Sequence, residues 1–119
     1  MKRDYRLYLD DVLEAIGKIE RYTEGLSYDQ FRKDEKTIDA VITNFTIIGE
    51  AAKQIPPKIR RCYPGISWKE MAGMRDKLVH EYFGIRLDVL WETITVRLPQ
   101  LKPMIEELLE EFEEAMEKE

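Results

Sequence analysis

Arg75 and His80 are the two residues of this chain whose types and spacing best suit catalysis. Histidine titrates near neutral pH and can move a proton, whereas arginine carries a permanent charge that can hold a phosphate. A histidine that activates a ribose 2′-hydroxyl and an arginine that neutralises the attacked phosphate would together cleave RNA without a metal ion. The spacing alone is unspecific, because many helices contain an arginine and a histidine five residues apart.

The helix that must position these residues is predicted over residues 68–83, where Ser67 and Glu70 have the spacing of a capping box and Gly84 is a stop signal. Arg75 lies in the middle of its apolar stripe, which consists of Trp68, Met71, Ala72, Leu78, Val79 and Tyr82. A guanidinium on a core-facing position needs an anionic partner, since its desolvation is costly. That partner is a phosphate, a facing subunit or a carboxylate such as Glu50 in a structural salt bridge.

His80, the only histidine, lies roughly 140° around the helix from Arg75 at about 100° per residue. A site built from both therefore needs a distorted helix end or two copies of the chain that meet across a two-fold axis. A lone histidine near a helix C-terminus also suits a structural role that the helix dipole stabilises. With no second histidine and only one cysteine, we expect no metal site of the usual kind and no cofactor.

The remaining elements are also predicted to be helical. Apolar residues recur at helical spacing over residues 4–22, 37–55, 87–97 and 99–116, with Pro99 in the first turn of the last helix. Residues 28–34 suit either a short helical turn or a loop, and residues 56–67 are predicted to be a loop after Pro56 and Pro57. We predict an all-α fold with one domain over residues 1–119, a four-to-five-helix up-and-down bundle.

The helix over residues 37–55 has a second, weaker apolar stripe of Ala40, Ile47 and Ala51, interrupted by Asn44. This pattern favours burial on more than one side, as in a central bundle helix or a dimer helix. Asn44 and Glu50 are secondary candidates for a function, because they are polar on or beside faces that are otherwise buried. Their roles stay open at this point.

Composition limits the class of protein further. The single cysteine, Cys62, excludes an intrachain disulfide, and no apolar run approaches a membrane span, so we expect a cytoplasmic protein without a membrane anchor. The net charge is −5, but residues 53–86 carry eight Lys or Arg against three acids, a local +5. Residues 104–119 carry eight glutamates against one lysine, a local −7. The basic middle could meet a phosphate backbone, although ordinary solvated helix faces would look similar.

At Arg75-Asp-Lys-Leu-Val-His80-Glu-Tyr82 the sequence resembles the Arg-x-x-x-x-His-x-Tyr signature of the HepT-like proteins of the HEPN superfamily. These are toxins of prokaryotic toxin-antitoxin pairs. The similarity extends to Ile47-Ile-Gly-Glu-Ala-Ala-Lys53, to Ile66-Ser-Trp-Lys-Glu-Met-Ala-Gly-Met74 and to Leu90-Trp-Glu-Thr93. It covers nearly the whole chain.

The resemblance implies a HEPN-like homodimer with a composite, metal-independent endoribonuclease site in which Arg75 and His80 are catalytic. It implies the toxin of a type VII-like toxin-antitoxin system. Its partner would be a minimal nucleotidyltransferase antitoxin, MntA-like, that neutralises the toxin by AMPylation of Tyr82. The adenylyl group would block RNA and occupy Arg75. A packed aromatic ring with a wet hydroxyl is the other interpretation of Tyr82.

Asp76 is a supporting candidate that could orient Arg75 or His80, or could be a solvated helix residue. Two further functions stay open beside the ribonuclease. One is a non-catalytic subunit that presents a nucleotide or substrate to a nucleotidyltransferase. The other is a helical interaction protein without any site.

Overall fold

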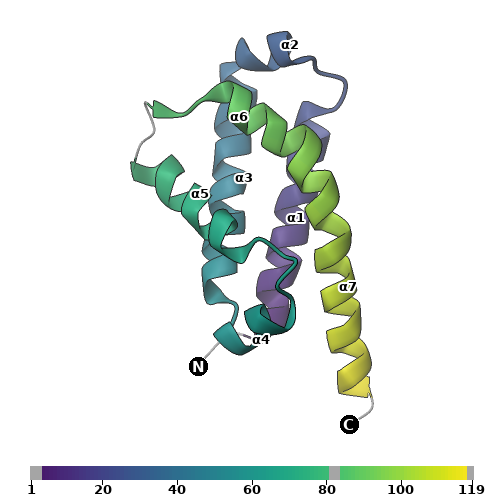
Figure 1. The fold of residues 1–119 in the computed structure, drawn as a ribbon. Helices are drawn as coiled ribbons and strands as arrows, with labels where there is room; N and C mark the ends of the chain where they lie inside the picture. The colour runs from purple at the N-terminus through teal and green to yellow at the C-terminus, as the bar shows by residue number, and fades with distance from the viewer. Residues whose placement is uncertain (1–3, 81–83, 118–119) are drawn as a thin grey trace.

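The computed structural model describes residues 4–80 and 84–117, and within these ranges the chain is helical and contains no strand. The predicted first helix is α1, Tyr5–Thr23, which begins at the N-cap Asp4. The strongest periodic segment is α3, Glu35–Gln54, which the side chain of Asp34 caps. α1 and α3 run antiparallel along the length of the molecule (Figure 1).

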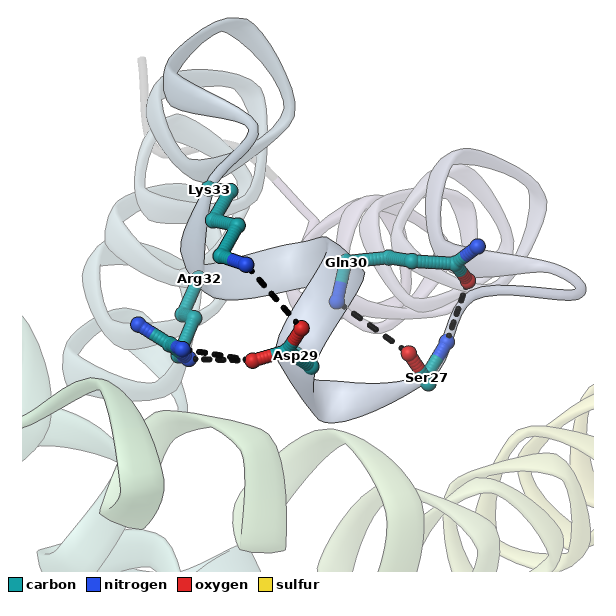
Figure 2. Close-up of polar contacts among 5 residues, drawn as sticks. All are labelled: Ser27, Asp29, Gln30, Arg32 and Lys33. Atoms are coloured by element: carbon teal, nitrogen blue, oxygen red, sulfur yellow. Dashed lines mark hydrogen bonds and ion pairs between the residues drawn. The ribbon is translucent and has the colours of Figure 1, made fainter.

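The short helix α2, Tyr28–Arg32, joins these two long helices and resolves the segment that sequence patterns left open. Ser27 and Gln30 form a reciprocal capping box, which satisfies two backbone amides at the start of the helix (Figure 2). Asp29 forms ion pairs with Lys33 and Arg32, and the hydrogen bond from Lys33, followed by that from Arg32, lowers the pKa of its carboxyl group. Local capping and charge therefore form a helix that periodicity alone could not identify in so short a segment.

After α3, residues 57–62 form the one-and-a-half-turn helix α4, Pro57–Cys62, and here the predicted loop is wrong. Pro57 occupies the first turn, where a missing amide donor costs nothing, so this proline starts a helix after Pro56 has ended the previous one. The connection to the next helix is held to the bundle by the Tyr63 hydroxyl, which donates to Glu111. This hydrogen bond, more than burial, raises the pKa of Tyr63 to about 12.

The predicted site helix is α5, Trp68–His80. Its buried residues are Trp68, Met71 and Leu78, whereas Val79 is 46% exposed, so the prediction that Val79 faces the core is wrong. Val79 lies in the last turn, where the core that covers Leu78 does not reach it. α5 packs on α3 (Figure 1). The predicted extension to residue 83 lies outside the described residues.

The last two predicted helices are one continuous rod. α6, Leu87–Glu92, passes through the π-turn Thr93–Arg97 (η2) into α7, Leu98–Glu117, without a break (Figure 1). In the π-turn the Leu98 amide donates to the Thr93 carbonyl, one residue further back than in an α-helix. The wider turn lies just before Pro99, which cannot donate to the ladder and whose ring would crowd an α-helical carbonyl. A proline that was expected to begin a helix is therefore accommodated inside one.

The core lies where α1, α3 and α7 meet. Its fully buried side chains from these helices are Leu9, Val12, Ile16, Ile19, Val41 and Ile105. At the α2 end, Phe31 is sealed against Trp91 of α6, with ring centroids 5.0 Å apart. The prediction of an all-α helical bundle is confirmed.

Candidate functional site

The position of Arg75 depends on a close contact between the backbones of α3 and α5 at Gly49. A Cβ atom added to Gly49 would lie 2.8 Å from the carbonyl oxygen of Met71, and closer still to the Cβ of Arg75. Separations this short are forbidden to real side chains, so only glycine allows this approach. The contact brings the start of the Arg75 side chain onto the surface of α3.

From that point the Arg75 guanidinium meets two carboxylates. Its Nε faces Glu50 of α3 in an ion pair, and its Nη1 donates to Asp76 at 3.1 Å. The Arg75 side chain is 25% exposed and Nε itself is buried. The expectation that a guanidinium on the core side of α5 requires an anionic partner is correct. Of the candidates from sequence, Glu50 is the carboxylate that serves.

Asp76 is shared between the two helices, because Lys53 of α3 also donates to its carboxylate. The hydrogen bond from Lys53, followed by that from Arg75, lowers the pKa of Asp76 below its ordinary value. Glu50, Lys53, Arg75 and Asp76 thus form a four-residue network of alternating charge, which we call the α3–α5 ion network. The network limits the directions in which the guanidinium can point, since two of its three nitrogens have partners.

His80 lies at the C-terminal end of α5 and is exposed. Among the described residues it forms no hydrogen bond or ion pair with Arg75 or with Asp76. The structure therefore brings Arg75 and Asp76 together but does not bring His80 to them. This agrees with the angular offset of about 140° that the helical repeat requires. Tyr82, the predicted site of modification, lies outside the described residues.

Two members of the site were missed by sequence reasoning as individual residues. From the sequence, Gly49 is noticed only within the stretch 47–53, which is similar to a known family, and Lys53 only at the end of that stretch and in a basic region. The signal for Gly49 was present, because a glycine inside a strong helical stripe lowers helix stability and usually marks close packing. Lys53 carried no such signal. Asn44, by contrast, is 6% exposed and donates to the Ala40 carbonyl of its own helix, away from this network.

The opposite flank of α5 borders a groove of about 440 Å³. Phe45 of α3 lines it, Met71 belongs to its α5 wall, and Leu101 belongs to its α7 wall. The side chains of Glu70 and Arg97 span it in an ion pair of 3.9 Å, and both are mostly exposed. The groove and the α3–α5 ion network thus lie on different sides of the same helix.

In residues 4–80 and 84–117, no group of three or more histidine, cysteine, aspartate or glutamate side chains is arranged to hold a metal ion. Within the same ranges no helix has both the length and the apolar composition needed to cross a bilayer.

Comparison with known proteins assigns the chain to a family. The family model described as "Ribonuclease HepT-like" matches residues 12–108. The chain belongs to the ribonuclease HepT-like family. A protein of Thermococcus cleftensis named "Probable ribonuclease HepT" is 48% identical over 108 residues, which cover 91% of this chain and 98% of the relative. A protein of Methanocaldococcus jannaschii named "Putative RNase" is 40% identical over 112 residues, which cover 94% and 93%.

A third ribonuclease HepT-like relative, from Caldanaerobacter subterraneus and also named "Putative RNase", is 39% identical over 105 residues, covering 88% of this chain and 94% of the relative. No solved structure matches the chain significantly. The predicted resemblance to HepT-like proteins is confirmed, and so is the prediction that the chain is an enzyme of a ribonuclease family.

Proposed function

We propose that this chain is a metal-independent endoribonuclease whose active site forms between two copies, with Arg75 and His80 as catalytic residues. The observation that carries the proposal is the geometry of α5 in a member of the ribonuclease HepT-like family. One chain orients Arg75 through the α3–α5 ion network yet leaves its own His80 apart at the exposed helix end. A second copy would supply a histidine where the first cannot.

The reaction that these groups support is transfer of the RNA phosphate to the adjacent 2′-oxygen. His80 accepts the proton of the 2′-hydroxyl as its oxygen attacks phosphorus, and the bond to the 5′-oxygen breaks. The partner subunit's His80 returns a proton to the leaving 5′-oxygen. Arg75 stabilises the charge on the non-bridging oxygens through Nη2, which is in no ion pair with a described residue. The products are a 2′,3′-cyclic phosphate and a 5′-hydroxyl.

Two exposed apolar side chains, one on α3 and one on α5, support the pairing of two copies. Ile47 of α3 is 39% exposed and Val79 of α5 is 46% exposed. Ile47 is near Glu50 in sequence on α3, and Val79 is near Arg75 on α5. Burying such side chains against a second copy would remove apolar area from water and place two networks near one another.

The test is cleavage of RNA by purified protein in excess EDTA, with analysis of the new ends. We expect 2′,3′-cyclic phosphate termini, and we expect His80→Ala to lose at least about a hundredfold in rate, as removal of a general base does. The control is Lys36→Ala, which also removes one exposed side chain but lies at the start of α3. Cleavage by His80→Ala at the wild-type rate would show that His80 is not the general base. Wild-type protein that does not cleave RNA would instead favour the non-catalytic subunit of a nucleotidyltransferase.

We further propose that the enzyme is the toxin of a type VII-like toxin-antitoxin pair and that a minimal nucleotidyltransferase antitoxin adenylylates Tyr82. The support is the sequence spacing, which puts Tyr82 two residues beyond His80. An adenylyl group there adds a negative phosphate that would compete with RNA for Arg75. After incubation with the antitoxin and ATP, mass spectrometry should find AMP on the peptide with Tyr82 and none on Tyr82→Phe. AMP on another residue would contradict this assignment.

A further inference from the structure

The solvent side of α5 contains a glycine that no contact among the described residues explains. Gly73 lies in the middle of α5 and is exposed, and a Cβ added to it would meet nothing within 4 Å in the described structure. Glycine within a helix lowers stability relative to alanine, so alanine would fit here and would also favour the helix. Gly49 on α3 differs, because a Cβ there would collide with α5. No described residue of this chain accounts for Gly73 in the same way.

The side chains around Gly73 indicate the charge of a molecule that would contact it. At about 100° per residue, Lys69 and Lys77 lie within about 40° of Gly73 around the helix, and His80 within about 20°. All three are exposed, and neither lysine is ion-paired with any residue in the described ranges. We call Lys69, Gly73, Lys77 and His80 the outer strip of α5. Its length from Lys69 to Lys77 is about 12 Å.

Within residues 4–80 and 84–117, the acidic residues nearest to this strip are already occupied. Asp76 and Glu70 each lie about 60° from Gly73, on opposite sides. Asp76 is held by Lys53 and Arg75 of the α3–α5 ion network, and Glu70 pairs with Arg97 across the groove. The outer strip therefore presents two lysines and a histidine around a bare stretch of helix backbone.

We propose that the outer strip is the track of the RNA backbone, with Gly73 at its point of closest approach and with Lys69 and Lys77 on phosphates to either side. The proposal rests on the ribonuclease function and specifies how its substrate reaches His80. A polyanion fits three cationic side chains on one helix face, and the absence of a Cβ lets a phosphate lie against the helix backbone. A second copy fits less well, because a two-fold contact through this strip would set lysines against lysines.

The deciding experiment compares Gly73→Ala with Gly17→Ala. Gly17 is also inside a long helix, and a Cβ there would make only an ordinary 3.6 Å contact with the side chain of Arg21. Both substitutions should raise the melting temperature through helix propensity. Binding of a fluorescent, fully 2′-O-methylated RNA oligonucleotide, which cannot be cleaved, is measured by anisotropy. We expect Gly73→Ala to bind about tenfold more weakly, the effect of roughly one charge-assisted contact, and Gly17→Ala to bind as wild type does.

The lysines are tested by the salt dependence of the same binding. Lys77→Ala should reduce the slope of log K against log salt concentration by about 0.7, the amount for one phosphate on a single strand. Lys36→Ala, which removes an exposed lysine of α3, should leave the slope unchanged. An unchanged slope for Lys77→Ala would contradict the assignment of a phosphate to this lysine.

Failure of the RNA track and failure of the ribonuclease function give different results. Equal RNA affinity of Gly73→Ala and wild type, with cleavage of ordinary RNA intact, would overturn the track and leave the ribonuclease standing. A lower molar mass of Gly73→Ala in light scattering, with unchanged RNA affinity, would show that the strip contacts a second copy and would also overturn the proposal. Wild-type protein that neither binds nor cleaves RNA would overturn the ribonuclease function, and the track with it.

Discussion

The two flanks of α5 are built differently. Toward α3, the helix backbones touch at Gly49, and the ion network of Glu50, Lys53, Arg75 and Asp76 joins the two helices. Toward α7, a groove of about 440 Å³ separates the walls, and the pair between Glu70 and Arg97, at 3.9 Å, spans it. α5 is thus fixed closely on the flank of Arg75 and only loosely on the other.

This difference indicates which contacts control the candidate site. The orientation of Arg75 depends on α3, since its Cβ packs against Gly49 and its guanidinium pairs with Glu50. The groove can change in width without moving Arg75, because its α5 wall turns a different set of side chains toward α7. Substitutions on the α3 flank should therefore cost more stability than those on the groove flank.

The largest effect is expected for Gly49→Ala. A methyl group there would push α5 away from α3 at Met71 and Arg75, and overpacking of this kind costs about 1–3 kcal/mol of unfolding free energy. The gain in helix propensity offsets up to about 1 kcal/mol of that. Urea denaturation should give a lower midpoint for Gly49→Ala and a higher one for Gly17→Ala. A midpoint above that of wild type would show that the two helices are not in close contact.

Asp76→Asn should produce a smaller effect that depends on pH. Lys53 and Arg75 lower the pKa of Asp76 in the folded state, so the folded protein holds the charged carboxylate more favourably than the unfolded chain does. The resulting stabilisation is present above the ordinary aspartate pKa of about 3.9 and is lost as pH falls through the lowered folded value. Wild type should exceed Asp76→Asn in stability at pH 7, and the difference should shrink in acid.

The control for the pH series is Asp10→Asn, because Asp10 is exposed on α1 and has no ion pair within the described residues. Its difference from wild type should stay flat over the same range. A difference for Asp76→Asn that is constant from pH 7 into acid would mean that the ion network does not hold this carboxylate.

The smallest effect is expected on the groove flank. Glu70→Gln removes a long ion pair between side chains that are 74% and 61% exposed, and the unfolding free energy should change by less than about 0.5 kcal/mol. Glu50→Gln is the matched substitution on the other flank, where Arg75 is only 25% exposed, and there we expect about 1 kcal/mol. Equal losses from the two variants, measured by urea denaturation, would remove the contrast between the flanks.

Sequence patterns predict the site helix and the need of Arg75 for an anionic partner because both follow from local rules. Helical periodicity locates the core face, and a guanidinium on that face requires an anionic partner. The contact at Gly49 could not be predicted in this way, because a glycine in a stripe does not say which helix approaches it. The predicted burial of Val79 is wrong for a similar reason, since periodicity does not show where along a helix its packing partner ends.

Two predictions about the fold are wrong, and both concern prolines. Different rules apply to the two prolines. Pro57 is predicted to end a helix and enter a loop, whereas it starts α4, which is too short to show a period, and Pro99 is predicted to lie in the first turn of a helix. Pro99 does lie in the first turn of α7, yet the preceding π-turn joins α7 to α6 without a break. One extra residue in a helical turn does not change the amino-acid composition, so only the structure shows that α6 and α7 form one continuous rod.

The π-turn and the prolines also make the two walls of the groove unequal in stiffness. Pro99 and Pro103 have no amide hydrogen, so neither can donate to the carbonyl four residues earlier in the rod. The α7 wall is therefore the part of the rod with the fewest backbone hydrogen bonds. The α5 wall, in contrast, is an uninterrupted α-helix that packs on α3. Bending of the rod at this weak point would open or narrow the groove as a hinge does, while the arginine on the far side of α5 keeps its place.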